Sequence, residues 1–195
     1  MRKLIVAVLA VSLIWSASAV AEDAFSKVKV FVEGKEVKDA GFIREGSKSP
    51  VVSLNALDDE LQAFVSYDDD KQVVSISKPN VHVFPIQVSK GQVLPFGSVT
   101  EGPNQFKIQA QVDSLQVKIN GLRFSLQDPT GKVVYSTTYD ENQVEDLGRE
   151  FWLTSPTIKH DFKFVGKYTV RVWMTQADTK AWTLVAEKVI RSQAE

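Results

Sequence analysis

Apolar and polar positions alternate along most of the C-terminal part of the chain, which predicts extended strands. Phe106, Ile108 and Ala110 alternate with Lys107 and with glutamines, and this two-residue period is typical of a strand with one buried face. The same period predicts further strands at 122–126, 132–135, 158–164, 167–175 and 182–190. Several short strands separated by turn residues indicate an antiparallel β-sandwich of Ig-like kind.

Turn residues and one conspicuous strand support this prediction. The tetrad Asp128-Pro129-Thr130-Gly131 has the residues of a tight turn, because proline presets φ and glycine admits a positive φ. After Gly166, alternate residues from Tyr168 to Met174 are apolar and share one face of a predicted strand. The segment GKYTVRV (166–172) resembles the G-x-Y-x-v-x-V strand that occurs in many exported domains of this type.

The part from residue 28 to residue 76 has a different pattern, which predicts strand, strand, helix, strand, strand. The alternating stretch 28–32 leads through a turn at Glu33-Gly34-Lys35 into a second strand, and 51–54 is extended. Leucines at 54, 57 and 61 with Phe64 recur at spacings of three and four, which predicts an amphipathic helix. A hairpin over 64–76 closes a unit of about 50 residues, which is small for a core of its own.

These N-terminal residues resemble a known family. The segments that carry the resemblance are VFVEGKEV (30–37), PVVSL (50–54), LQAFVSYD (61–68) and VVSI (73–76). They are similar to the copper amine oxidase N-terminal-like domain, also called the stalk domain, whose pattern is a VNGK hairpin, a VPLR strand, a lGA-V-WD turn and a VTI strand. The chain departs from that pattern at Glu33, Ser53, Asn55, Gln62 and Tyr67.

The resemblance implies a small α+β module at residues 28–78, of a kind found in exported bacterial proteins, but it does not imply copper. In the oxidases, three histidines of a large catalytic domain bind the metal beside a tyrosine that becomes the quinone cofactor. The present chain has only His82 and His160, and neither stands in an H-x-H or H-x-x-H spacing. We therefore expect no metal and no cofactor.

Prolines and glycines between Pro79 and Gly97 suggest the passage between two domains. Apolar residues such as Val81, Val83 and Ile86 indicate that part of this passage is extended and packed. We expect a connecting segment at 79–91 and the Ig-like β-sandwich domain at 92–191.

The N-terminus has the three parts of a secretory signal peptide. Arg2 and Lys3 precede an apolar run at 4–15, and a small-residue stretch follows at 16–21. A run of about 12 residues is shorter than the roughly 20 needed to cross a bilayer. We expect residues 1–21 to be removed, and the mature chain to have no transmembrane segment and to be secreted, extracellular or cell-wall associated.

Composition narrows the possible functions. The 195 residues include 23 Lys and Arg against 24 Asp and Glu, a balance that gives no basic footprint for nucleic acid. The chain has no cysteine, which excludes disulfides, a thiolate zinc site and a cysteine nucleophile. No G-x-S-x-G elbow, H-E-x-x-H helix or glycine-rich phosphate loop occurs. We therefore expect no catalytic residues and no enzyme.

The candidate contact residues are tryptophans. Trp152, Trp173 and Trp182 all lie in the predicted sandwich. They either pack across strands and in the core, or form an aromatic platform for a ligand.

Three functions remain open. The preferred one is a non-enzymatic exported protein that associates with the cell wall, an extracellular matrix or another protein through its stalk-like and sandwich domains. The second is a carbohydrate or small-ligand binding module that uses the tryptophans. The third is a hydrolase with an unrecognised site, for which Asp140, Glu145 and His160 are the residues to substitute.

Overall fold

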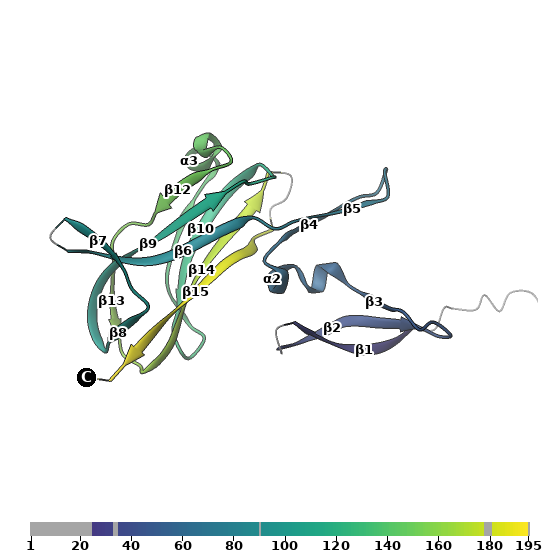
Figure 1. The fold of residues 1–195 in the computed structure, drawn as a ribbon, viewed down its shortest axis with the longest axis horizontal. Coiled ribbons are helices and arrows are strands. Elements are labelled where there is room, and N and C mark those ends of the chain that lie inside the picture. The colour runs from purple at the N-terminus through teal and green to yellow at the C-terminus, as the bar shows by residue number, and fades with distance from the viewer. Residues whose placement is uncertain (1–24, 33–34, 90, 178–180, 195) are drawn as a thin grey trace, which may run out of the picture. The chain divides into compact units, whose positions relative to one another are not determined.

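The computed structural model describes residues 25–32, 35–89, 91–177 and 181–194 (Figure 1). The predicted signal peptide at 1–21 and residues 33–34 of the first predicted turn lie outside the described residues. The chain divides into two compact units, one ending at Ala56 and one beginning at Leu57. The expected stalk-like domain, 28–78, is therefore divided between the two units.

The first unit is a three-stranded antiparallel sheet. Strand β1 (Phe25–Val32) pairs with β2 (Lys35–Arg44), β2 pairs with β3 (Pro50–Val52), and a 3-10 turn, η1 (Leu54–Ala56), follows. Gly41 allows the strands to approach closely, since a Cβ there would lie 2.6 Å from Val30 Cγ2. Among the described residues up to Ala56, Ala40 is the one buried apolar side chain. This sheet thus has little core of its own.

The predicted amphipathic helix is replaced by two short turns. Residues 54–56 form η1, and α2 (Asp58–Leu61) is a single turn whose last residue donates to the carbonyl of Leu57. Gln62 has a φ of 51°, in the left-handed region, so the helix ends there. The described residues of 28–78 thus contain strands and short turns, without the longer helix expected of the α+β domain.

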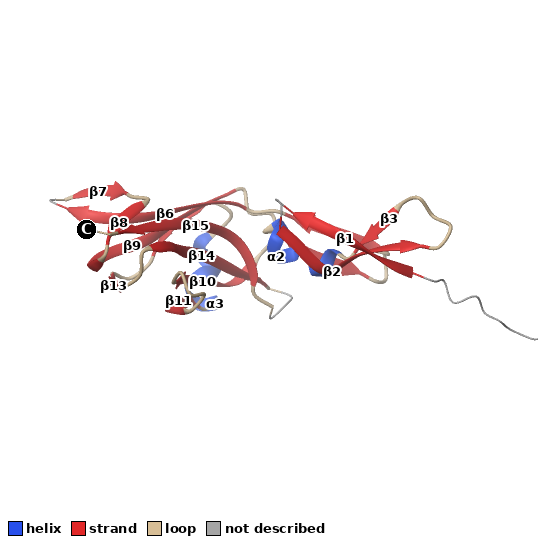
Figure 2. Ribbon diagram, turned by 90° about the horizontal axis from the view of Figure 1, so that it is seen from below, coloured by secondary structure: helices blue, strands red, loops and turns tan. Residues whose placement is uncertain are grey.

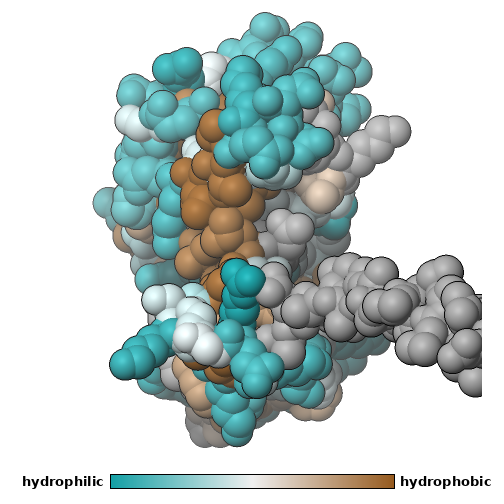
Figure 3. Space-filling view, turned by 90° about the vertical axis from the view of Figure 1, so that its right-hand side faces the viewer, coloured by the Kyte–Doolittle hydropathy of each residue, from teal (hydrophilic) through white to brown (hydrophobic). Residues whose placement is uncertain are grey.

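The second predicted hairpin is confirmed. Strand β4 (Phe64–Asp68) pairs with β5 (Val73–Ser77) and projects from the sandwich in Figure 1. Val65 pairs with Ile76 and Tyr67 with Val74, so these four share one face, and the last three are about half exposed. The side of the molecule viewed in Figure 3 carries a band of apolar side chains between hydrophilic ones.

The rest of the second unit is a mostly antiparallel β-sandwich, in which only β8 and β15 pair in parallel among the described strands. This confirms the predicted all-β part. One sheet has the order β12-β9-β6-β7, with β13 also paired to β9, and the other has the order β11-β10-β14-β15-β8 (Figures 1 and 2). The bounds are β6 (Asn80–Ser89), β7 (Gln92–Pro95), β8 (Ser98–Thr100), β9 (Gly102–Asp113), β10 (Ile119–Gln127), β11 (Val133–Tyr139), α3 (Glu141–Val144), η2 (Glu145–Leu147), β12 (Phe151–Thr154), β13 (Ile158–Phe162), β14 (Gly166–Gln176) and β15 (Thr183–Gln193).

The segment expected to connect two domains, 79–91, is largely strand β6 of the sandwich. It pairs with β9 from Asn80, opposite Asp113, to Ile86, opposite Lys107. Val83 and Ile86 are buried, and Val83 belongs to the sandwich core with Val81 packed against it. The sandwich therefore begins about ten residues before the expected boundary near residue 91.

The core lies between the two sheets. Ile108 on β9, Phe124 on β10 and Val172 on β14 are fully buried in one apolar cluster. Tyr168, Val170, Val172 and Met174 are buried on β14 while the residues between them are largely half-exposed, as the alternation predicts. Because each sheet gives one face to this core, the opposite face of each remains available to solvent or a partner.

One end of the sandwich is fixed by a tyrosine. The Tyr168 hydroxyl accepts a hydrogen bond from the Phe164 backbone N–H at 3.2 Å. Gly166 has a φ of 140°, and a Cβ there would lie 3.2 Å from Pro129 Cγ. The turn between β13 and β14 thus packs directly against the turn between β10 and β11.

We expect Tyr168→Phe to lower the free energy of unfolding by about 1–2 kcal/mol, because the Phe164 amide loses its acceptor in a partly buried place. The measurement is urea unfolding of the mature chain. Tyr67→Phe is the matched control, since Tyr67 is 56% exposed and the change there should cost little. Equal unfolding midpoints for the two variants would contradict the stabilising role.

Candidate functional site

The three tryptophans are divided between the two sheets. Trp152 is on β12, opposite Gln111 of β9, and is 57% exposed. Trp173 is on β14 of the other sheet, and Trp182 immediately precedes β15. The structure therefore does not assemble the three into one platform.

Trp152 belongs to a row of outward side chains that crosses three strands. Gln111 of β9 stands between Trp152 of β12 and His82 of β6. Neighbouring strands are about 4.8 Å apart, so the row spans about 10 Å. We call the outward residues around this row the Trp152 face, namely His82, Phe84, Gln109, Gln111, Asp113, Trp152 and Thr154. Lys107 lies on the same side of β9, two residues before Gln109.

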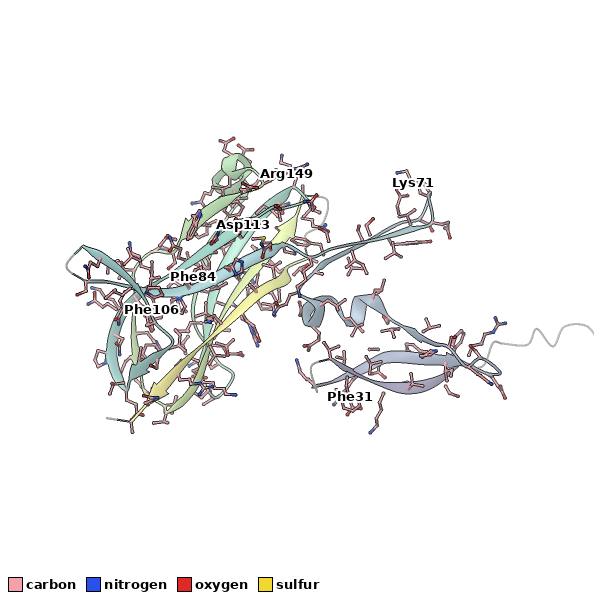
Figure 4. The ribbon with its side chains drawn as sticks, in the orientation of Figure 1. Phe31, Lys71, Phe84, Phe106, Asp113 and Arg149 are labelled. Carbon is pink, nitrogen blue, oxygen red and sulfur yellow. The ribbon has the colours of Figure 1, made fainter. Side chains whose placement is uncertain are left out.

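The Trp152 face combines aromatic rings with planar amides and a carboxylate. The rings of His82 and Phe84 are stacked with centroids 6.5 Å apart. Gln111 Nε2 donates to the Asp113 carboxylate at 3.1 Å. Phe84 and Asp113 are labelled on β6 and β9 in Figure 4. An exposed indole can stack on an apolar surface, while the amides beside it can donate and accept hydrogen bonds.

The other two tryptophans form a packed cluster on the opposite sheet. The Arg123 guanidinium lies 3.9 Å from the centre of the Trp182 ring, a cation–π contact. Arg123 is also directly opposite Trp173, whose Nε1 donates to Ser125 Oγ at 3.1 Å. Gly121 makes room for this cluster, because a Cβ there would lie 3.1 Å from Trp182 Cη2. These half-buried rings pack across strands and leave less surface for a ligand than Trp152.

His160 lies elsewhere, beside a cavity at the end of the sandwich where the two turns meet. Its ring packs edge-on against Phe162 and Tyr168, with centroids 4.9 and 5.6 Å away. The Nε2 atom is buried and has no hydrogen-bond partner among the described residues. Asp140 precedes α3 and Glu145 is in η2, and neither lines the cavity beside His160.

Burial lowers the pKa of His160 below its ordinary value, because an imidazolium would lose hydration there. The carboxylates of Asp161 and Asp128 act in the opposite direction, and Lys163 reinforces the lowering. The net result favours the neutral imidazole near pH 7. The sequence singles out His160 as a residue to substitute, but it does not reveal the cavity. The lining of the cavity comes from turns about 30 residues apart in the chain.

Comparisons with known proteins identify no family: no family model and no curated protein matches the chain. Among solved structures, the C-terminal domain of wzt is similar at a TM-score of 0.35 and 11% identity, covering 74% of this chain and 90% of that one. The soluble domain of PmoD from Methylocystis sp. ATCC 49242 (Rockwell) reaches 0.33 and 13%, covering 65% and 95%.

A third solved structure is similar over a part of its length. The extracellular domain of the one-component system BT4673 from B. thetaiotaomicron has a TM-score of 0.31 and 9% identity, covering 86% of this chain and 25% of that one. Within the described residues, the helices are all too short or too polar to span a bilayer.

The lowered pKa of His160 predicts a pH dependence of stability. The unfolded chain takes up a proton on this group near its ordinary pKa of about 6.5, and the folded chain does so only at lower pH. The contribution to stability is thus present above pH 6.5 and is lost as the pH falls through that value. The loss levels off below the folded pKa.

The measurement is the free energy of unfolding by urea at pH 7.5 and at pH 5. His160→Phe keeps an aromatic ring against Phe162 and Tyr168 and removes the titrating group. We expect this variant to lose less stability than the wild type between the two pH values. An identical loss in both proteins would contradict the assignment to His160.

Proposed function

We propose that the chain is a non-enzymatic, exported bacterial protein whose sandwich associates with a cell-wall polymer, a matrix or another extracellular protein. The observation that carries the proposal is the Trp152 face, where a tryptophan is 57% exposed in a row of amide and aromatic side chains. The signal-peptide pattern at 1–21 and the stalk-domain resemblance support export and envelope association.

The composition of this face supports a contact role. Isolated apolar residues are common on protein surfaces and need no explanation. Here the exposed indole has Gln111 beside it and Phe84 and His82 beyond, while the nearest lysine on this side of β9 is Lys107, four residues from Gln111. Interface cores are enriched in aromatic residues and depleted of Lys and Glu. The face therefore resembles a contact surface more than a solvated one.

An Ig-like sandwich supplies the frame for this proposal. The order β11-β10-β14-β15 corresponds to the C′-C-F-G sheet of that fold, with β6 and β9 in the places of strands A and B. The hydrogen bond from the Phe164 N–H to the Tyr168 hydroxyl is the tyrosine-corner contact at the start of strand F. Both features support the Ig-like assignment, with the N-terminal strands as its stalk-like extension.

A carbohydrate ligand is a second candidate, and one observation favours it. The Trp152 ring is flanked by Gln111, and Gln109 and Asp113 stand on the same side of β9. Sugar rings offer an apolar face for stacking and hydroxyls for such amides and carboxylates. A shift of tryptophan fluorescence on titration with purified wall glycans, lost in Trp152→Ala, would favour saccharide over protein.

The association is tested by fractionating the native culture into medium, salt wash and purified wall. We expect the mature chain on the wall, resistant to salt and released by denaturant. Recovery from the medium alone, with no partner in the envelope, would contradict the proposal.

We expect Trp152→Ala to weaken this retention by more than about tenfold, because an aromatic at the centre of a contact commonly dominates its energy. The control is Tyr67→Ala, which removes an aromatic side chain of nearly equal exposure, 56% against 57%, from the β4–β5 hairpin. Retention is measured as the bound fraction over a titration of purified wall. Equal losses in the two variants would contradict a contact at the Trp152 face.

A further inference from the structure

The cavity beside His160 has the dimensions of a small-molecule site. Its volume is about 490 Å³, within the range of about 300–1,000 Å³ typical of ligand pockets. Its lining comes from the β10–β11 turn, from β13 and the turn after it, and from the start of β14. Val134, Phe164 and Tyr168 give it an apolar part. These turns are held together by the contact of Gly166 with Pro129 and by the Tyr168 hydroxyl.

The charged groups that line the cavity differ in whether they already have hydrogen-bond partners within the protein. Asp128 Oδ1 accepts hydrogen bonds from the N–H groups of Thr130 and Lys132, at 2.9 and 3.0 Å, and from the Thr130 hydroxyl at 2.6 Å. This carboxylate is therefore committed to the turn. Three other charged side chains line the cavity: Lys132, Lys163 and Asp161.

His160 lines the cavity, but its Nε2 atom is buried and faces away from solvent. A buried polar atom without a hydrogen bond costs about 1–3 kcal/mol, and Nε2 has no partner among the described residues. The ring is held in place by Phe162 and Tyr168. Because Nε2 is itself buried, a ligand in the cavity does not reach it, and the contacts to a ligand come from the other lining residues.

We propose that this cavity binds a free α-amino acid with an apolar side chain. Its carboxylate pairs with the ammonium groups of Lys132 and Lys163, and its ammonium pairs with Asp161. Its side chain packs on Val134 and Phe164. This zwitterion matches the two cationic groups, the one uncommitted carboxylate and the apolar part of the lining. The proposal does not depend on the function proposed for the Trp152 face.

The test is titration of the mature chain with L-phenylalanine, followed by amide NMR shifts and calorimetry. Two blocked probes, N-acetyl-L-phenylalanine and L-phenylalaninamide, each remove one charge of the zwitterion. We expect each to bind at least about tenfold more weakly than the free amino acid, because each loses a charge-assisted interaction. Blocked probes that bind as tightly as the free amino acid, or no shift at millimolar amino acid, would overturn the proposal.

Variants locate the binding on the protein. We expect Lys163→Gln and Asp161→Asn each to weaken L-phenylalanine binding by at least about tenfold. Lys159→Gln is the matched control, because Lys159 is exposed on β13, the strand that carries Asp161, and does not line the cavity. Trp152→Ala should also bind normally, so a failure here is distinguishable from a failure of the wall-association proposal. Equal weakening in Lys163→Gln and Lys159→Gln would overturn the assignment.

Discussion

The central strands of the sandwich each give one set of side chains to a shared apolar interior, and this constraint determines where function can lie. Ile108, Phe124 and Val172 are fully buried in that interior, so their neighbours on the same strands point to the two outer faces. On β12, β9 and β6 the outward set includes Trp152, Gln111 and His82. A one-residue slip of register would bury this set and expose the core. The position of the candidate contact surface is thus fixed by the packing of the opposite face.

The same packing also builds the end of the sandwich. Tyr168 is an inward residue of β14, yet its hydroxyl reaches the Phe164 amide in the preceding turn. Gly166 then allows Pro129 of the neighbouring turn to approach within contact distance. Because both turns are held in this way, the charged side chains of 132, 161 and 163 stand around one cavity on a rigid frame. Binding there would require little ordering of the chain, which lowers its entropic cost.

The alternation of β14 and the β4–β5 hairpin could be predicted from the sequence because both depend on neighbours in the chain. The helix expected over 54–64 does not form, because the backbone at Gln62 is left-handed. The spacing of the apolar residues alone does not reveal this conformation. Pro79 and Pro85 predict a connecting segment because proline is a turn residue, but residues 80–86 pair with β9 and form a strand of the sandwich. The separation of Trp152 from Trp173, and the cavity beside His160, depend on which strands join which sheet. Such long-range pairings leave no local pattern.

Strand β9 also determines how far apart the two proposed sites are. Trp152 stands opposite Gln111, and His160 stands opposite Asn104, seven residues back along the same strand. At about 3.4 Å per residue, this separation is about 24 Å. Two ligands at that distance do not touch, and screening at physiological salt leaves little direct electrostatic interaction between them. Any coupling would have to pass through β9, whose inward residues are tightly packed in the core, or through the segment that joins β12 to β13. A partner on the sheet face and a small molecule at the end of the sandwich can therefore be bound independently.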